Sequence, residues 1–450
     1  SRSESPSCHC SSGDLLQMTS SKYFEFSADF SEGGDDTAKI SLRVGERVIS
    51  RIADTEKQTV RDYFRASSTG LALWLADNWW RLRWETIRDF RVPSVDWRLR
   101  HELNSASGGA LWPPVMIFSV GDRIAFAPSV SKNIVGGPQS YFDFKIGMVA
   151  AHEYDPELDR FFEAVLCNCA MTVDGKALEI LLKQIAIERQ DPEVAAWRRL
   201  EACLGFDPDA APDEVVNSLV KLDDVAGEDG VEEAAHAQPG ASSAQFLNLV
   251  IEATRESEVE VDLSLADDLT CDGSLPSYAS PWQMAEAAAK ELRSIIGVPR
   301  GLLRHKAIED IFKARWDDLK SATATARTLP YGARICNETK SRVALQTYWS
   351  YDRRFELARL FGDAAWQKGS CFGITSRAKT DRQKFQRAFA HGLLCPFDDL
   401  QRVLDVKDPT PEAMQAAARR FGVHPSVVRN QLVYKGYLPF ENTNEETEAA

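Results

Sequence analysis

Histidines are the residues of this chain best suited to bind a catalytic metal, and they are widely dispersed. The seven are His9, His101, His152, His236, His305, His391 and His424. A zinc-binding helix carries two histidines four residues apart, with a glutamate directly after the first. His152 precedes Glu153, but the residue four positions on is Pro156. Ser107-Gly108-Gly109 is too short for a phosphate-binding loop and is typical of a turn. The sequence therefore predicts neither a metal nor a cofactor.

Arg359 and Asp363 are the pair whose spacing is most informative. Residues four apart lie on one face of a helix, where their side chains can meet. The surrounding residues form an apolar frame made of Phe355, Leu357, Ala358 and Gly362. We expect Arg359 and Asp363 to form an ion pair or to share a hydrogen-bond network.

The segment Arg354–Asp363 resembles the active-site helix of the ImmA/IrrE family of zinc metallopeptidases, with its His-Glu-x-x-His motif. Arg359 stands at the position of the first histidine and Asp363 at that of the second. Leu360 replaces the glutamate that acts as general base. By this resemblance the apolar frame is kept and the catalytic residues are lost, so no catalytic residue and no zinc are expected.

The resemblance extends over roughly the last third of the chain. Trp282–Gly297 resembles the opening helix of the family's domain, and Ala333–Cys336 with Arg342–Gln346 resemble its small antiparallel sheet. Arg382–Pro396 resembles the block that supplies the third zinc ligand. Gln383 and Phe385 occupy its glutamate positions.

The family's peptidases are associated with cleaving repressors or antitoxins in phage, mobile-element and stress responses. The resemblance implies a zincin-like helical domain in a bacterial, cytoplasmic protein of regulation or phage defence. Such a pseudoenzyme would bind a protein partner and possibly DNA. A peptidase or other hydrolase with a non-standard active site is the alternative.

A closing helix pair carries the strongest signal for binding. Thr410-Pro411 predicts a helix start, Gly422 a helix end, and Pro425 a second helix to about Tyr434. This spacing is similar to a helix-turn-helix. The candidate DNA contacts are Arg377, Lys379, Arg382, Lys384, Ser426, Arg429, Asn430 and Lys435. Alternatively, the two helices only close the domain.

Charge is distributed unevenly along the chain. The net charge of the whole chain is -14, which argues against nucleic-acid binding. Residues 278–440 nevertheless hold 27 lysines and arginines against 16 aspartates and glutamates, a net charge of +11, which leaves -25 for the remainder. A basic surface on this part would favour phosphate contacts. Alternatively, the uneven charge has no binding role, and the acidic segments merely keep the chain soluble.

Residues 22–206 predict an N-terminal α+β domain of unknown function. Period-two alternation in Lys22–Ala28 and Ala38–Val44 indicates strands, and Val115–Phe126 indicates a hairpin. Asp155–Ile187 and Pro192–Leu204 are expected as amphipathic helices. Six tryptophans within forty residues favour a large core over an exposed binding surface: Trp74, Trp79, Trp80, Trp84, Trp97 and Trp112.

The remaining segments complete a two-domain, α+β organisation. Residues 1–21 are expected to be a disordered tail and 441–450 an acidic tail. Residues 207–245 are expected to be a flexible acidic linker, in which Asp213–Val220 is the one stretch that could form a short helix. Residues 246–277 are an uncertain connection in which Val259–Leu265 alternates like a strand returning to the first domain. By the resemblance, residues 278–440 are expected to form an ImmA/IrrE-like domain. Nine scattered cysteines favour reduced cytosolic thiols, and no apolar run predicts a membrane span.

Overall fold

The computed structural model describes residues 24–31, 36–89, 93–106, 111–129, 138–270, 280–320, 329–337, 340–347 and 349–438. The expected tails at 1–21 and 441–450 lie outside these residues. The chain is a mixed α+β protein, and its described residues group into two compact units. Unit 1 draws on Ser1–Asp77, His101–Ile117 and Arg123–Ile185; unit 2 draws on Asn78–Arg100, Phe118–Asp122 and Ala186–Ala450.

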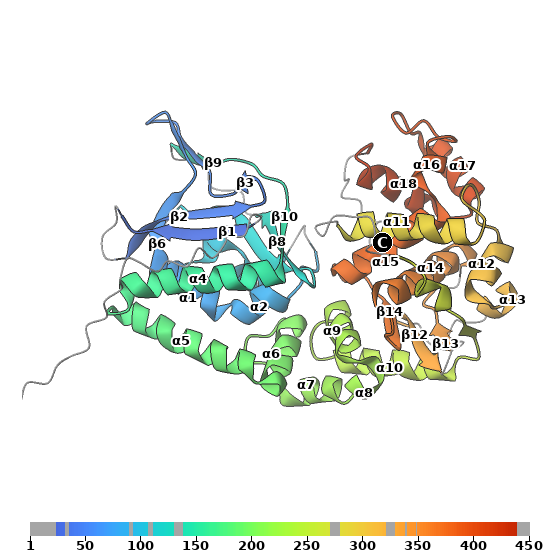
Figure 1. Cartoon of the computed structure of the whole chain (residues 1–450), viewed down its shortest axis with the longest axis horizontal. Coiled ribbons are helices and arrows are strands. Elements are labelled where there is room, and N and C mark those ends of the chain that lie inside the picture. Colours follow the sequence, from blue (N-terminus) through green and yellow to red (C-terminus); the bar gives the residue numbers. More distant parts are fainter. Residues whose placement is uncertain are drawn as a thin grey trace, which may run out of the picture. The chain divides into compact units, whose positions relative to one another are not determined.

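Unit 1 contains small sheets covered by helices (Figure 1). Its strands are β1 (Phe24–Asp29), β2 (Thr37–Val44), β3 (Arg47–Val48), β4 (Ile52–Asp54), β5 (Thr59–Arg61), β6 (Phe64–Ser67), β7 (Val115–Ser119, which runs on into unit 2), β8 (Arg123–Pro128), β9 (Gln139–Tyr141) and β10 (Gly147–Ala150). Strand β2 pairs with β1, β3 and β6, while β4 lies between β5 and β9, and β8 between β10 and β7. Its helices are α1 (Ser68–Asp77), α4 (Ala151–Cys169) and most of α5 (Val173–Gln190).

The strand predictions for unit 1 are confirmed, and one helix prediction needs correction. Phe24 and Phe26 of β1 point into the core, and the Phe26 ring stacks on Phe161 of α4 at 4.5 Å between centroids. The expected helix Asp155–Ile187 is two helices, because the backbone turns at Thr172. There the Thr172 hydroxyl donates to the carbonyl of Cys169 at 2.7 Å and accepts from the amide of Gly175 at 2.9 Å.

The tryptophan cluster is mostly core. Trp79, Trp80, Trp97 and Trp112 are only 4–5% exposed. Buried aromatic area of this size is a main source of stability in a domain. The interpretation as core is therefore confirmed for these four side chains.

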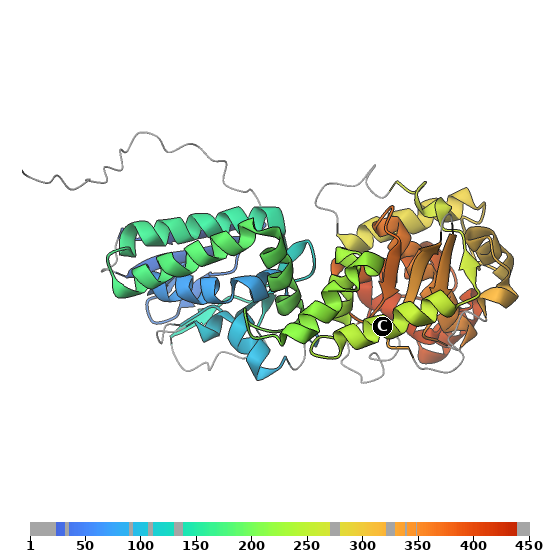
Figure 2. The same ribbon diagram turned by 90° about the horizontal axis from the view of Figure 1, so that it is seen from below.

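Unit 2 is a four-stranded antiparallel sheet between two layers of helices (Figures 1 and 2). The strand order is β11 (Glu260–Val261), β13 (Lys340–Ala344), β12 (Gly332–Asn337) and β14 (Phe372–Thr375). The helices of unit 2 before the sheet are α2 (Trp79–Trp84), α3 (Val95–His101), α6 (Pro192–Leu204), α7 (Asp213–Val220), α8 (Asp223–Ala226), α9 (Glu228–Ala237) and α10 (Ser243–Glu256). The later ones are α11 (Pro281–Ile295), α12 (His305–Phe312), α13 (Trp316–Leu319), α14 (Ser350–Trp366), α15 (Asp381–Leu394), α16 (Phe397–Leu400), α17 (Pro411–Phe421) and α18 (Pro425–Tyr434).

Each face of this sheet has its own apolar core. Adjacent residues of β13 point to opposite faces, so Val343 packs with α11, α14 and α15, whereas Ala344 packs with α7, α9 and α10. The strand expected at Ala333–Cys336 is confirmed within β12, and the one expected at Arg342–Gln346 begins earlier, at Lys340, and ends at Ala344. Helix α11 also begins as expected, with a reciprocal cap between Ser280 and Gln283.

The expected acidic linker at 207–245 is wrong, because this segment folds into α7, α8, α9 and the start of α10. Apolar residues at helical spacing, among them Val216, Leu219 and Val231, are buried against the sheet. Arginines neutralise part of the acidic surface. Arg199 of α6 pairs with both Glu228 and Glu232 of α9. The short helix expected at Asp213–Val220 is confirmed as α7. The rest of the prediction failed because high acidity was taken as disorder.

The strand expected within Val259–Leu265 exists, but it does not return to the first domain. Strand β11 pairs with β13, so that Glu260 lies opposite Arg342 and Val261 opposite Ser341. The connection after α10 is thus part of unit 2. Among the described residues, no helix is long and apolar enough to span a membrane.

Candidate functional site

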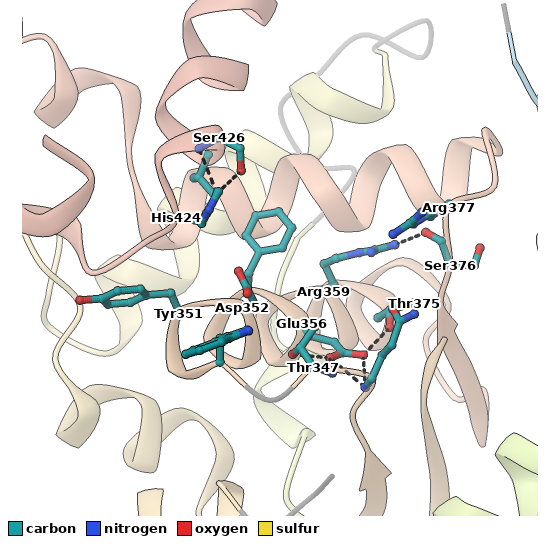
Figure 3. A pocket seen from close by; sticks show the side chains of 14 residues that line it. Thr347, Tyr351, Asp352, Glu356, Arg359, Thr375, Ser376, Arg377, His424 and Ser426 are labelled. Atoms are coloured by element: carbon teal, nitrogen blue, oxygen red, sulfur yellow. Dashed lines mark hydrogen bonds between the residues drawn. The ribbon is translucent and has the colours of Figure 1, made fainter. Parts of the chain in front are cut away.

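A pocket of about 780 Å³ opens over the middle of α14, where Arg359 lies (Figure 3). Its walls come from the first half of α14 with the residues before it, from the end of β14, and from the N-terminus of α18. All three belong to unit 2. This volume falls within the roughly 300–1,000 Å³ typical of ligand pockets.

Arg359 lies at the floor of the pocket and is 8% exposed. Its Nη2 donates to the carbonyl of Ser376 at 2.6 Å and to Oε1 of Gln383 at 2.7 Å. Its buried Nε has no hydrogen-bond partner among the described residues. Burial, and after it the charge of Arg387, lowers the pKa of Arg359 to about 9. The guanidinium therefore stays charged at neutral pH and has donor capacity left for a ligand.

Gln383 of α15 fixes Arg359 in place. Its Oε1 also accepts from the amide of Ser376 at 2.9 Å, and its Nε2 donates to the carbonyl of Ile374 and to Glu233, both at 3.0 Å. All of these groups are buried. Arg359 and Gln383 are thus in direct contact. In the family resemblance they stand at the positions of the first histidine and of the third zinc ligand.

Asp363, four residues after Arg359 on α14, belongs to a buried ion cluster and does not line the pocket. It forms ion pairs with Arg382 of α15 at 2.7 Å and with Arg334 of β12 at 3.0 Å. Burial by itself would raise the pKa of Asp363, but the charges of Arg382 and Arg334 outweigh it and lower that pKa. Asp363 is therefore an ionised carboxylate held between two arginines.

The expected ion pair between Arg359 and Asp363 is wrong, because Asp363 pairs with Arg382 and Arg334 instead. The alternative, a shared hydrogen-bond network, is confirmed. Gln386 links the two residues: its Nε2 donates to Asp363 at 2.7 Å, and its Oε1 accepts from Arg359 at 3.4 Å. An amide can bridge in this way because it carries both a donor and an acceptor. Sequence reasoning missed Gln386, whose partners lie on another helix.

Glu356, one helical turn before Arg359, is a carboxylate that sequence reasoning also missed. It accepts from the amides of Gln346 and Thr347 and from the hydroxyls of Thr347 and Thr375, at 2.9–3.2 Å. Burial raises the pKa of Glu356. These donors hold the loop before α14 against the sheet, so Glu356 has a structural role. Its spacing of three residues from Arg359 was the signal that could have identified it.

Leu360, which stands where the family resemblance would place a general base, is apolar. Leu360 is fully buried among the side chains of α14 and α15. A general base must be able to take up a proton within hydrogen-bond reach of the substrate. The hydrocarbon side chain of Leu360 has no atom that can take up a proton.

The rim of the pocket carries aromatic and polar side chains. Trp349 is 76% exposed and Tyr351 is 47% exposed. His424 caps α18: its Nδ1 accepts from the amide of Ser426 at 3.3 Å and lies 2.8 Å from the Ser426 hydroxyl. Asp352 lines the same wall, and burial raises its pKa against the opposing charge of His424.

The closing helix pair forms as the sequence predicts. Thr410 caps α17, Gly422 ends it with a positive φ of 64°, and α18 begins at Pro425. Positive φ is a conformation that glycine adopts without steric cost.

Three of the eight candidate DNA contacts are engaged in ion pairs. Arg382 is buried on Asp363 and is not available to a phosphate, which corrects its assignment. Lys384 pairs with Asp381 at 3.3 Å, and Lys435 with Glu286 at 2.7 Å.

The other five candidates are exposed or half-buried, and Lys384 and Lys435 are half-buried as well. Arg377 is exposed at the pocket rim, whereas Ser426, Arg429 and Asn430 are half-buried. Lys379 is also half-buried, and burial lowers its pKa to about 8.

Within the described part of the chain, no group of three or more histidine, cysteine, aspartate or glutamate side chains is placed to hold a metal ion. Comparison with known proteins found no matching family model, no matching curated protein and no matching solved structure.

Proposed function

We propose that unit 2 is a non-catalytic recognition module of zincin-like design, in which the pocket over α14 binds an anionic segment of a protein partner. The observation that carries the proposal is Arg359: a buried, charged guanidinium at the pocket floor, with a donor still unpaired. An unpaired buried donor costs about 1–3 kcal/mol, and a ligand carboxylate would recover that free energy. The resemblance to ImmA/IrrE peptidases supports a non-catalytic role for this pocket, since Arg359 stands where a zinc ligand would.

A carboxylate is the ligand chemistry that fits the floor best. A hydrogen bond from a charged arginine N–H to a carboxylate is roughly twice as strong as one between neutral groups. Arg377 at the rim adds a second positive charge, and the N-terminus of α18 adds backbone dipoles that favour an anion. The carboxylate of Glu356 in the same pocket is already held by four donors.

The rim suits the rest of a peptide. Trp349 and Tyr351 are large exposed aromatic side chains beside the charged floor. Aromatic side chains and arginine are the residues enriched at the energetic centres of protein interfaces. The proposed ligand is therefore a short segment with a carboxylate, from an acidic side chain or a chain terminus, next to an apolar side chain.

A pooled library of four-residue peptides tests the proposal. Half of the library has free C-terminal carboxylates and half has amidated C-termini, and peptides retained on the immobilised full chain are identified by mass spectrometry. The proposal predicts enrichment of acidic and free-terminus peptides, lost in Arg359→Met and weakened in Arg377→Ala. Arg315→Ala is the matched control, because Arg315 is an exposed arginine outside the pocket. Retention without charge preference would overturn the proposal.

A hydrolase with a non-standard site is the second candidate, and the contact of Ser426 with His424 in the same pocket as Asp352 favours it. Neutral histidine can take the proton of a serine hydroxyl as that oxygen attacks. A fluorophosphonate probe tests this: attack by the Ser426 oxygen would expel fluoride and leave a labelled serine. Labelling lost in Ser426→Ala would establish the hydrolase, whereas an unlabelled pocket leaves His424 as a helix cap only.

DNA contact through α18 and a role in bacterial regulation or phage defence also belong to this proposal. The helix pair α17–α18 supports DNA contact, and the exposed Arg377 adds to it. Regulation and defence rest on the family resemblance alone.

A further inference from the structure

Two cysteines lie opposite each other on neighbouring strands of the unit 2 sheet. Strands β12 and β14 pair in antiparallel register, with Ile335 opposite Phe372. The next pair in this register is Cys336 and Cys371, and the Cys336 amide donates to the Cys371 carbonyl at 2.8 Å. Directly opposite residues in antiparallel strands have Cα atoms roughly 4.5–5.5 Å apart, which lies inside the roughly 4.4–6.8 Å spanned by disulfides.

The two thiols differ in their access to solvent. Cys371 is exposed, whereas Cys336 is half-buried, and both are free thiols. Burial, and after it contact with the Cys371 thiol, raises the pKa of Cys336. A small oxidant therefore reaches Cys371 first, and Cys336 is positioned behind it as a second thiol. This arrangement of an exposed and a resolving cysteine is typical of reversible oxidation sites.

We propose that Cys336 and Cys371 are a reversible oxidation site that forms a disulfide in response to a hydroperoxide. The Cys371 sulfur attacks the peroxide, whose O–O bond breaks, to give a sulfenic acid and water or an alcohol. The Cys336 sulfur then attacks the sulfenyl sulfur, forms the S–S bond and releases water. Two thiols lose two electrons and two protons, and the peroxide takes up both.

The disulfide would fasten the strand ends that carry the ion cluster. Ser370, next to Cys371, accepts from Arg334 at 2.8 Å, and the carbonyl of Phe372 accepts from Arg382 at 3.2 Å. Both arginines hold Asp363. The closed loop between the two cysteines also contains the whole of α14. Oxidation would thus restrain the helix that bears Arg359, and this inference does not depend on what the pocket binds.

Peptide mapping of the full chain tests the site. The reduced protein is treated with hydrogen peroxide, free thiols are alkylated, and the digest is analysed by mass spectrometry. We expect a cross-linked peptide joining Cys336 to Cys371, about 2 Da lighter than the two thiol peptides and lost again with dithiothreitol. Cys167→Ser is the control, because Cys167 is exposed but lies on α4, and the cross-link should persist in it.

A thermal melt gives the second readout. Closing a long loop stabilises the folded state, so the oxidised wild type should melt several degrees above the reduced form, and peroxide should leave the melting temperature of Cys371→Ser unchanged. Peroxide that takes Cys371 to its sulfinic acid, or joins it to another cysteine, without the Cys336 cross-link would overturn the proposal.

Discussion

Asp363 and Arg382 should be strongly coupled in stability, because the structure buries them as an ion pair. Asp363 is fully buried and holds two arginines at 2.7 and 3.0 Å. Asp363→Ala would leave both guanidinium groups in the protein interior without their carboxylate. Removing one partner of a buried ion pair costs about 3–5 kcal/mol, which corresponds to roughly a hundred- to several-thousand-fold in the folding equilibrium.

A double-mutant cycle measures this coupling by denaturant unfolding. Asp363→Ala, Arg382→Ala and the double variant are compared with the wild type, and residues in direct ionic contact should show a coupling energy of about 1–3 kcal/mol. Repeating the cycle with Arg359→Met in place of Arg382→Ala should give a smaller value, because Arg359 reaches Asp363 through the amide of Gln386 and not through a direct ion pair. Additive losses for Asp363 with Arg382, or a larger coupling for Arg359, would refute this account of the cluster.

Three further predictions follow from the same unit. Gly373→Ala should cost about 3 kcal/mol or more in unfolding free energy, because a Cβ there would lie 1.7 Å from Asp363 Oδ2; Gly369→Ala, opposed only by its φ of +76°, should cost about 1–2 kcal/mol. The lowered pKa of Asp363 means that its ion pairs stabilise the fold above the ordinary carboxyl pKa of 3.8. That contribution should be lost as pH falls through the lowered value, so urea midpoints below about pH 4 should drop more steeply for the wild type than for Asp363→Ala. DNA binding at about 50 mM salt, followed by fluorescence anisotropy, should fall steeply with added salt and weaken in Arg377→Ala/Arg429→Ala; equal affinity of this variant and the wild type would discard α18 as the contact.

That DNA test needs the full chain. A fragment starting at residue 278 would lack β11, which pairs with β13, and α7–α10, which form the core on one face of the sheet. A binding result from such a fragment would therefore report on a different structure.

Local patterns in the sequence placed the closing helix pair, whereas β12, β13 and α14 were expected from the family resemblance and β14 was not predicted. The cap at Thr410 and the glycine at 422 each act through the nearest residues, so their signals survive without tertiary information. Comparison with a metal-binding helix also brought Arg359 and Gln383 into one site. The contacts of Arg359 and Asp363 could not be assigned, because their partners Ser376, Arg334 and Arg382 come from separate strands and helices.

The acidic segment shows the other limit of the sequence. The prediction counted its acidic residues but not Arg199 of α6, which pairs with two of them. It also could not foresee that Glu233 accepts a hydrogen bond from Gln383, 150 residues later in the chain. Contacts between residues so far apart in the sequence do not produce a periodic pattern of residue types. The pocket was missed for the same reason, since three separate segments form its walls.

Retention of the peptide library by the wild type and by Arg359→Met decides whether the pocket recognises anionic peptides through Arg359. Circular dichroism of both proteins establishes that the variant keeps its fold. Recognition through Arg359 predicts that the wild type retains free-terminus or acidic peptides at least ten-fold over neutral amidated ones, and that a folded Arg359→Met loses this preference. The same preference in a folded Arg359→Met would contradict the claim.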